Sequence, residues 1–427
     1  MTILDFRAIK NAIAVSAAAQ ETAINTEQTM DQSILCALGD VINLEPRREG
    51  NENELNGKEE ADTVYDLGNL ASGTLNFEKC QPNHAAFVMA YALGTIATAA
   101  AGSGYAHTIT PLSGDIDSDR SNPTFTAMQR FGNAVLKRRF ASMAVDSFSL
   151  DASRDSWLKL SAQIKGTGKH TNNVIEESIT AKDDATSLTL AANAVEGADA
   201  AARLKNVQRI RVELTSGVWT DVVYSAVSDA TPAVITITKP DAETTDVTYK
   251  VLYVPDEAAW ATFPARIAET PLRVSEISLN VGGAWSGSAF AGGRSYSAEV
   301  NSLQWQFNNN MQVQFNFGAS GAYASRAYRD GRSQTIALDR EFRNYIFQQH
   351  IDDNDTFGVQ MLAEGAEYET GHNYTVKAVW PKCSMLKSPI KVDGKKNAEA
   401  GDLMVLEHDT YGSVIVLVKN LQAAYMA

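Results

Sequence analysis

The segment from Asp353 to Glu364 comes closest to a metal-binding motif. Four positions of a helix-loop-helix calcium site, the first, third, sixth and twelfth, are matched by Asp353, Asp355, Gly358 and Glu364. The fifth position is Phe357, which has no side-chain oxygen, and residues 359–362 have the pattern of a strand where a calcium site requires a second helix. We therefore interpret the segment as a turn from a helix to a strand and expect no metal there.

Two other patterns that could support chemistry are incomplete. Gly166 to Thr171 is similar to the end of a phosphate-binding loop, but Gln163 stands at the position of the first glycine and His170 displaces the hydroxyl residue. An exposed hairpin end fits this segment better. The histidines are scattered and no serine lies in a nucleophile elbow, so we expect no enzymatic activity and no cofactor.

Length and charge limit the classes of protein that remain. The 427 residues suffice for two domains with sizeable cores, and the formal net charge is −14. Binding nucleic acid through its phosphates needs clustered lysines and arginines, whereas an acidic surface suits a conduit through which DNA passes without adhering. The widely spaced Cys36, Cys80 and Cys383 form no CxxC motif and indicate reduced thiols in a protein that folds in a cytosol.

The first twenty residues invite comparison with a signal peptide, because Arg7 and Lys10 precede a run of small apolar residues. Asp5 and Asn11 interrupt the required regions, and the run is mostly alanine. We expect an amphipathic helix or arm instead. No stretch reaches the roughly 18 to 20 apolar residues of a membrane span.

One sequence motif, which we call the phrase, occurs twice, in Val135–Gly166 and in Arg294–Gly318. It consists of two strands in which polar and apolar residues alternate, joined by a polar turn. Alternation places successive side chains on opposite faces of a sheet. In the second copy, strands 300–307 and 311–317 have an apolar set that can bury, Trp305, Phe307, Val313, Phe315 and Phe317. The opposite set is Gln304, Gln306, Gln312, Gln314 and Asn316. Burying these amides unpaired would be costly, so we expect one exposed polar wall.

Other segments predict a loop and two helices. Residues 44–66 hold eight acidic and three basic residues among glycines and asparagines, which predicts a long exposed loop. One helix is expected to start at Pro82 and to stop at Gly94. Another is expected from Leu338 to His350, where apolar residues repeat at four-residue spacing.

Residues 171–259 differ in kind, with fourteen acidic against seven basic residues. They predict the short strands of a small, Ig-like β-sandwich: Ser187–Leu190, Arg209–Leu214, Asp221–Ser225, Ala233–Thr238 and Thr248–Val254. Because the segment separates the two copies of the repeated phrase, we interpret it as an inserted, outward-facing domain. Residues 1–170 and 260–427 then form one mainly β fold.

The repeated phrase, together with EPRREGNENELNG and GTLNFEKCQPNHAAFVMAYALG near the N-terminus, resembles the tail tube proteins of long-tailed bacteriophages. The resemblance covers residues 40–170 and 262–425. It implies a tail-tube β-sandwich or partial barrel with a flanking helix, in subunits that join into rings, commonly hexamers. The rings stack into a hollow tube around a tape-measure protein, and DNA later passes through the lumen without specific binding.

The resemblance also implies partners and contact residues. Besides further copies of the chain, the expected partners are tape-measure, tail terminator and baseplate or distal tail proteins, in a virion tail assembled in the host cytoplasm. The face with Gln304, Gln306, Gln312 and Gln314 is assigned to the lumen or to a polar subunit contact. Contacts between rings are assigned to an acidic loop and a basic cluster: Arg47, Arg48, Glu52, Glu54, Glu59, Glu60, Arg138 and Arg139.

Two alternatives stay open. A self-assembling β-rich surface or adhesin protein is disfavoured by the missing export signal and the cysteine pattern. Another virion subunit, from the capsid or the sheath, is a nearer alternative, although a capsid shell usually needs a long spine helix and no such pattern occurs here.

Overall fold

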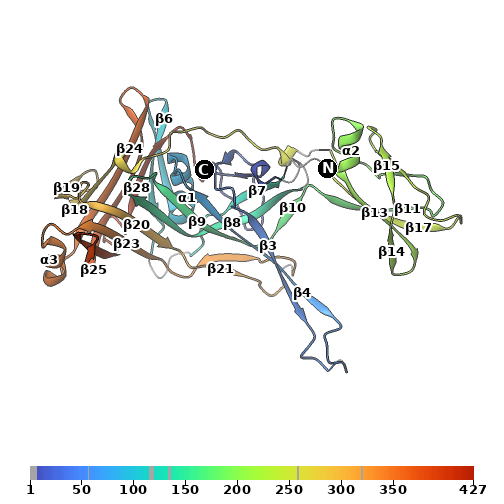
Figure 1. The fold of residues 1–427 in the computed structure, drawn as a ribbon, viewed down its shortest axis with the longest axis horizontal. Coiled ribbons are helices and arrows are strands. Elements are labelled where there is room, and N and C mark those ends of the chain that lie inside the picture. The colour runs from blue at the N-terminus through green and yellow to red at the C-terminus, as the bar shows by residue number, and fades with distance from the viewer. Residues whose placement is uncertain (1–6, 56, 115–119, 133–135, 257–258, 319–320) are drawn as a thin grey trace. The chain divides into compact units, whose positions relative to one another are not determined.

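The computed structural model describes residues 7–427 except 56, 115–119, 133–135, 257–258 and 319–320. The described chain is mainly β with large antiparallel sheets (Figure 1), as the sequence predicts. It divides into two compact units. The small unit consists of Met1–Ala12, Met128–Arg139 and His170–Phe263, and the large unit of Ile13–Ala127, Phe140–Lys169 and Pro264–Ala427.

The large unit contains two antiparallel sheets that share strand β25 (His372–Lys387). Its first half pairs with β28 and its second half with β27. The first sheet runs in the order β5 (Gly94–Ala101), β6 (Gly104–Pro111), β28 (Ile415–Asn420), β25, β24 (Phe357–Glu369), β18 (Ile277–Trp285) and β19 (Phe290–Ser295). The second runs in the order β3 (Ile42–Gly50), β4 (Val64–Phe77), β9 (Lys159–Gly166), β8 (Leu136–Ser153), β20 (Val300–Asn308), β23 (Ser333–Glu341), β27 (Lys396–Val405) and β26 (Ile390–Asp393).

Shorter elements complete the large unit. Strand β1 (Ala12–Val15) pairs with β2 (Gln32–Ile34), and β21 (Met311–Gln314) pairs with β22 (Arg326–Arg329). Helices α1 (Pro82–Leu93) and α3 (Ile346–Asp353) also belong to this unit, as do the first three residues of strand β7 (Phe125–Phe131), whose remainder from Met128 belongs to the small unit. All of α1 is buried, which explains its near-uniformly apolar sequence.

The helix from Pro82 is confirmed. Proline occupies a first-turn position, where its missing N–H removes no helical hydrogen bond. The helix ends at Gly94, whose φ of 94° is a left-handed cap conformation that glycine adopts without strain. The turn after α3 is also confirmed, since Asn354 has a φ of 46° and β24 begins at Phe357.

The helix predicted from Leu338 to His350 is wrong in its first half. Residues 338–341 belong to β23, where Ile336, Leu338 and Arg340 point inward, and α3 starts only at Ile346. A spacing of four residues is also even, so it fits a strand of period two as well as a helix. Asp339 and Glu341, acidic residues that would suit the first turn of the expected helix, therefore lie on a strand.

Three expected loops or arms also differ. Residues 44–66 are largely a hairpin, with β3 and β4 as its strands and residues 51–63 as its tip. The N-terminal helix is absent from the described residues, where a single 3-10 turn at Ala8–Lys10 leads into strand β1. The hairpin end at Gly166 is not exposed, because Thr167 is fully buried and Gly168 packs on the backbone of Asn69.

The small unit is a sandwich of a four-stranded and a three-stranded sheet. The first has the order β11 (Ile175–Lys182), β17 (Asp246–Tyr253), β13 (Val207–Thr215) and β14 (Val218–Asp221), and the second β12 (Ser187–Thr189), β16 (Val234–Ile237) and β15 (Tyr224–Val227). Helix α2 (Ala200–Asn206) and strand β10 (His170–Asn172) also belong to this unit. The two sheets share one core, which includes Val212, Ile235 and Tyr249.

Sequence periodicity located most of these strands. The stretch predicted as one strand at Asp221–Ser225 is divided between the end of β14 and the start of β15. Strand β11 was missed, because its exposed face carries glutamate, serine and threonine and it has no aromatic residue. Beyond segment 171–259, the unit also takes in His170, residues 260–263 and the described residues of 7–12 and 128–139.

Candidate functional site: a polar face and an exposed arm

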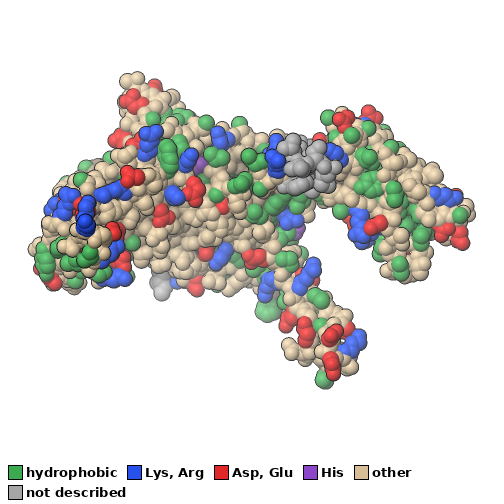
Figure 2. Space-filling view, in the orientation of Figure 1, with side chains coloured by type: hydrophobic (Ala, Val, Ile, Leu, Met, Phe, Trp, Pro, Cys, Tyr) green, Lys and Arg blue, Asp and Glu red, His purple; other side chains and the backbone are tan. Residues whose placement is uncertain are grey.

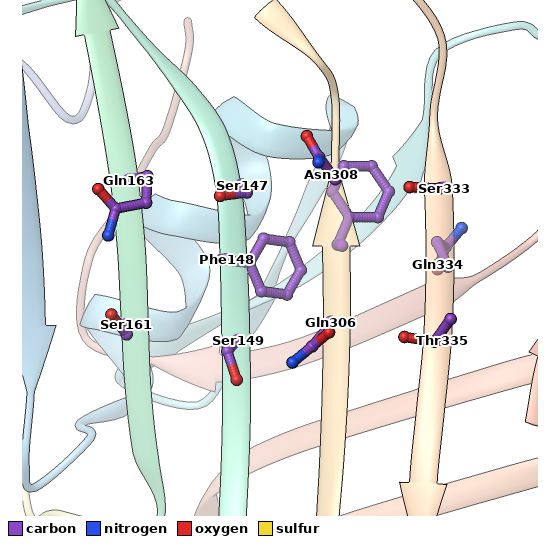
Figure 3. Close-up of a pocket in the computed structure, with 11 residues that line it drawn as sticks. Ser147, Phe148, Ser149, Ser161, Gln163, Gln306, Asn308, Ser333, Gln334 and Thr335 are labelled. Carbon is purple, nitrogen blue, oxygen red and sulfur yellow. The ribbon is translucent and has the colours of Figure 1, made fainter. Parts of the chain in front are cut away.

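Strands β9, β8, β20 and β23 lie side by side and align their polar side chains in rows. One row contains Gln163, Ser147, Asn308 and Ser333, and the next contains Ser161, Ser149, Gln306 and Thr335. Figure 3 shows these side chains along the four strands, where they line a shallow depression of about 410 Å³. Thr74 and Asn76 of β4 and Gln304 of β20 extend the same surface. We call these eleven residues the polar face.

The opposite side of the same strands is the core of the large unit. Phe148, Leu150, Trp305 and Phe307 alternate with the polar face and are buried. Phe148 meets Trp305 edge-on at a centroid distance of 4.8 Å and stacks on Phe307 at 5.3 Å. The alternating sequence therefore forms a sheet with one buried apolar face and one solvent-exposed polar face.

Hydrogen bonds link neighbouring strands across the polar face. The Thr74 hydroxyl donates to Gln163 Oε1 at 2.9 Å, and the Ser161 hydroxyl donates to Asn76 Oδ1 at 2.7 Å. Gln304 Nε2 donates to the Ser149 hydroxyl at 3.3 Å. Uncharged amides and hydroxyls that bond one another hold their positions while they remain open to water.

Four lysines on or beside the polar face each have a carboxylate partner. Lys159 lies 2.6 Å from Glu78, Lys165 lies 3.1 Å from Asp146, Lys387 lies 2.8 Å from Asp402, and Lys391 pairs with Asp339. The carboxylates raise the pKa of Lys387 and of Lys391 above its ordinary value. Because each positive charge sits beside a negative one, these lysines offer little net attraction to a phosphate chain.

The structure divides the four predicted glutamines between two sheets. Gln304 and Gln306 lie on the polar face, but Gln312 and Gln314 lie on β21, which pairs with β22 and not with β20. The prediction of one ribbon is therefore wrong for the second copy, although all four side chains are at least partly exposed.

Asn309 and Asn310 explain the departure of β21 from β20. Asn309 is buried and its Nδ2 donates to the carbonyl oxygens of Ala92 and Val145, while Asn310 adopts a φ of 49°. The chain therefore leaves the sheet at this point. Phe317, expected to bury, is fully exposed as a result.

The first copy of the phrase forms the ribbon that the second does not. Strands β8 and β9 pair directly, and β8 also pairs with β20, so the leading strands of both copies are neighbours. The residues that the first copy adds to the polar face, Ser147, Ser149, Ser161 and Gln163, were not singled out from the sequence. The alternation of polar and apolar residues in the first copy was the available sequence signal for them. These residues form one surface with those of the second copy only because the strands of the two copies pair.

The hairpin of β3 and β4 extends beyond the second sheet as an arm, which we define as residues 45–67 (Figure 1). Both of its faces are exposed, and charged side chains gather at its end (Figure 2). Leu55, Val64 and Leu67 are large apolar residues exposed on it. A two-stranded hairpin without its own core is marginally stable in water, so this arm is suited to lie against another surface.

Local bonds shape the tip of the arm. Asn51 Nδ2 donates to Asp62 at 2.8 Å, and Lys58 pairs with Asp62 at 2.6 Å, which lowers the pKa of Asp62 below its ordinary value. The Tyr65 hydroxyl donates to Glu54 at 2.8 Å, and this bond raises the pKa of Tyr65. Two acidic side chains of the tip, Glu54 and Asp62, are therefore bound by partners within the arm itself.

The predicted ring-contact residues fall into two groups. One group is exposed along the arm: Arg47, Arg48, Glu52, Glu54, Glu59 and Glu60. The other belongs to the small unit, where both residues are half-buried. Arg138 Nε donates to Asn172 at 2.7 Å, and the Arg139 guanidinium lies 4.8 Å from the centre of the Trp260 ring. These two arginines already bind partners within their own unit.

Among the described residues, no group of three or more His, Cys, Asp or Glu side chains is arranged to hold a metal ion. Burial raises the pKa of Cys36 to about 12 and raises those of Cys80 and Cys383 further, so these thiols are poor nucleophiles. No helix in the described part of the chain is long and apolar enough to cross a membrane. Comparison with protein-family models and with curated protein sequences finds no match.

Proposed function

We propose that this chain is the subunit of a bacteriophage tail tube, in which copies join into rings and rings stack into a hollow conduit for DNA. The polar face is the observation that carries the proposal. A tube wall needs one broad surface that is not used by the subunit core and does not retain phosphates. Rows of amides and hydroxyls backed by buried aromatic residues meet both requirements.

The arm supports the stacking part of the proposal. It is exposed on both faces, carries the predicted contact residues Arg47, Arg48, Glu52, Glu54, Glu59 and Glu60, and presents Leu55 to solvent. Covering such a hairpin with a neighbouring copy would bury its apolar side chains and pair its charges. In this proposal the arm is the contact between copies, and the polar face lines the lumen or a wet subunit contact.

The proposal also specifies a location and partners. The protein would reside in the virion tail after assembly in the host cytoplasm. A tape-measure protein would occupy the lumen during assembly, and terminator and distal tail proteins would close the two ends. DNA would pass the polar face without specific binding.

Electron microscopy of the purified protein, alone and after coexpression with the other tail proteins, tests the proposal. Hollow tubes with a regular ring repeat are the expected result. Particles that stay monomeric in both preparations, together with tails of the mature virion that lack this chain, would refute it.

A further inference from the structure

A pocket of about 540 Å³ opens on the first sheet of the large unit, whereas the polar face belongs to the second sheet. Thr108 and Thr110 of β6 and Leu417 of β28 line it, and they alternate with the core residues Ile109 and Val416. The pocket therefore lies on the face of the sheet that points away from the core. Its other sides are the turn between β18 and β19 and the loop that precedes β28.

A small apolar cluster, separate from the core of the large unit, supports the pocket. Trp285, Val379 and Ile415 are buried together in this cluster, and Tyr411 packs against them. Gly287 lies close to Tyr411, where an added Cβ would be 3.3 Å from the tyrosine ring. The turn and the loop thus each fix one aromatic side chain, Trp285 and Tyr411, at the pocket.

Hydrogen-bonding groups at the pocket lack partners within the protein. Trp285 is only 8% exposed, and no acceptor among the described residues lies within reach of its indole N–H. A buried donor without an acceptor is costly and uncommon in folded proteins. The hydroxyl groups of Thr108, Thr110, Ser288 and Tyr411 also line the pocket. These groups favour a ligand that brings several oxygen atoms.

One positive charge lies beside the pocket. Lys377 of β25 is the direct cross-strand neighbour of Leu417, and its Nζ lies 4.9 Å from the centre of the Trp285 ring. The ammonium group has no ion pair or hydrogen bond with a described residue, and burial lowers the pKa of Lys377. No acidic side chain is among the described residues that line the pocket. The ammonium group is therefore free to bind a carboxylate of a ligand.

We propose that this pocket binds an acidic sugar, a pyranose ring that carries a carboxylate. The carboxylate pairs with Lys377, the sugar oxygens bond to the threonine hydroxyls and to the N–H of Trp285, and the C–H face of the ring lies against Tyr411. The volume suits roughly one or two sugar rings.

The charge of the site favours a carboxylate over a phosphate monoester. One ammonium group balances the single charge of a carboxylate, whereas a phosphate monoester carries about −1.5 to −2 at neutral pH. A neutral sugar would leave Lys377 without a partner, and a bare carboxylate would leave the hydroxyl groups and Tyr411 unused. This binding activity goes beyond the proposed function, and its test requires no tubes.

Titrations followed by ligand-observed NMR, on the purified full-length chain, separate the parts of the ligand. Glucuronate, galacturonate and N-acetylneuraminate are the acidic probes, glucose and galactose are the neutral ones, and acetate supplies the carboxylate alone. At least one acidic sugar should bind with a Kd of about 1 mM, and about tenfold more tightly than the neutral sugars or acetate.

Three variants test the residues. Lys377→Met keeps most of the apolar stem and should weaken binding of the acidic sugar about tenfold, to the level of the neutral sugars. Leu417→Trp fills the pocket without removing a polar group and should abolish binding of every sugar. Lys395→Met changes an exposed lysine in the turn between β26 and β27 and should leave all affinities unchanged. Circular dichroism checks that each variant folds.

Three results would overturn the proposal. Absence of saturable binding by all three acidic sugars would remove the site. Acetate that binds as tightly as the acidic sugar would show that the sugar ring is not recognised. A preference for the acidic sugar that survives Lys377→Met or Leu417→Trp would place its binding elsewhere on the chain.

Discussion

Trp305 on β20 meets Trp380 on β25 edge to face, with ring centroids 5.1 Å apart and ring planes at 83°. Both side chains are fully buried, and they join the two sheets of the large unit directly behind the polar face. The polar face, which is proposed to belong to the tube wall, therefore depends on the packing of the buried aromatic core behind it.

Trp305→Ala should destabilise the folded chain by about 3–5 kcal/mol, because it removes a large buried ring and leaves a cavity. Trp305→Phe should cost less, since it keeps an aromatic ring. Chemical denaturation of the unassembled protein measures both. Gln306→Ala, at the next residue of the strand and on the exposed face, is the control, and its free energy of unfolding should stay within about 0.5 kcal/mol of wild type. An equal loss of stability at both positions would contradict the assignment of the two faces.

In the proposed tube, Gln306→Lys together with Gln163→Lys should leave folding and tube length unchanged, because both side chains lie on the exposed polar face. The new lysines would add positive charge to a surface whose own lysines are paired, and tubes should then retain DNA at low salt. Cosedimentation with DNA across a salt series measures the effect. Thr236→Lys, exposed in the small unit, should retain less DNA. Equal retention by both variants would argue against a lumen position for the polar face.

Glu269 should make stability fall as pH rises. Its buried carboxylate accepts the N–H groups of Asn83 and Leu421 at 2.8 and 2.9 Å, and burial raises its pKa to about 7 from an ordinary value of 4.5. The folded state therefore holds a proton between about pH 4.5 and 7 that the unfolded chain releases. The contribution of Glu269 to the free energy of unfolding is therefore largest below pH 4.5, and it declines as pH rises toward 7.

Glu269→Gln removes this titration and keeps the shape of the side chain. The free energy of unfolding of the wild type minus that of this variant should decline from about pH 4.5 to 7 and then stay constant. The buried His84, whose pKa is lowered to about 3 by its own burial, titrates in both proteins and cancels in the comparison. Denaturation curves at five pH values measure the difference. Parallel profiles would show that Glu269 does not titrate in this range.

Gly68→Ala should loosen the base of the arm. Gly68 has a φ of 87°, and an added Cβ would lie 2.2 Å from the carbonyl oxygen of Gly321, so the backbone must shift. Limited proteolysis should then cut the arm faster than in wild type. Gly57→Ala is a matched control, because Gly57 has a similar φ of 72° but open space around it, and it should have the smaller effect. A reversed order would contradict the packing at the arm base.

Regular local patterns in the sequence determined several features of this protein. The alternation through residues 300–307 defined a strand with Trp305 and Phe307 buried opposite exposed amides, because side-chain direction in a strand follows from period two alone. The helix from Pro82 to Gly94 was equally determined by its end residues. These features depend on interactions between neighbours in the chain.

Only the tertiary structure decided which strands meet. The breadth of the polar face follows from the pairing of β8 with β20, two strands about 150 residues apart whose register no local pattern specifies. Asn309 directs β21 out of that sheet through its hydrogen bonds to the carbonyl oxygens of Ala92 and Val145. The four-residue spacing of apolar residues that begins at Leu338 fits a strand as well as a helix, and only the structure shows that Leu338 lies on a strand.

The charged groups show the same division between sequence and structure. The sequence identified the acids of the arm, but the structure alone brought Lys377 to the ring of Trp285 and buried Glu269. Local conformation depends on adjacent residues, whereas sheet register, electrostatic environment and pKa depend on residues that approach only when the whole chain has packed.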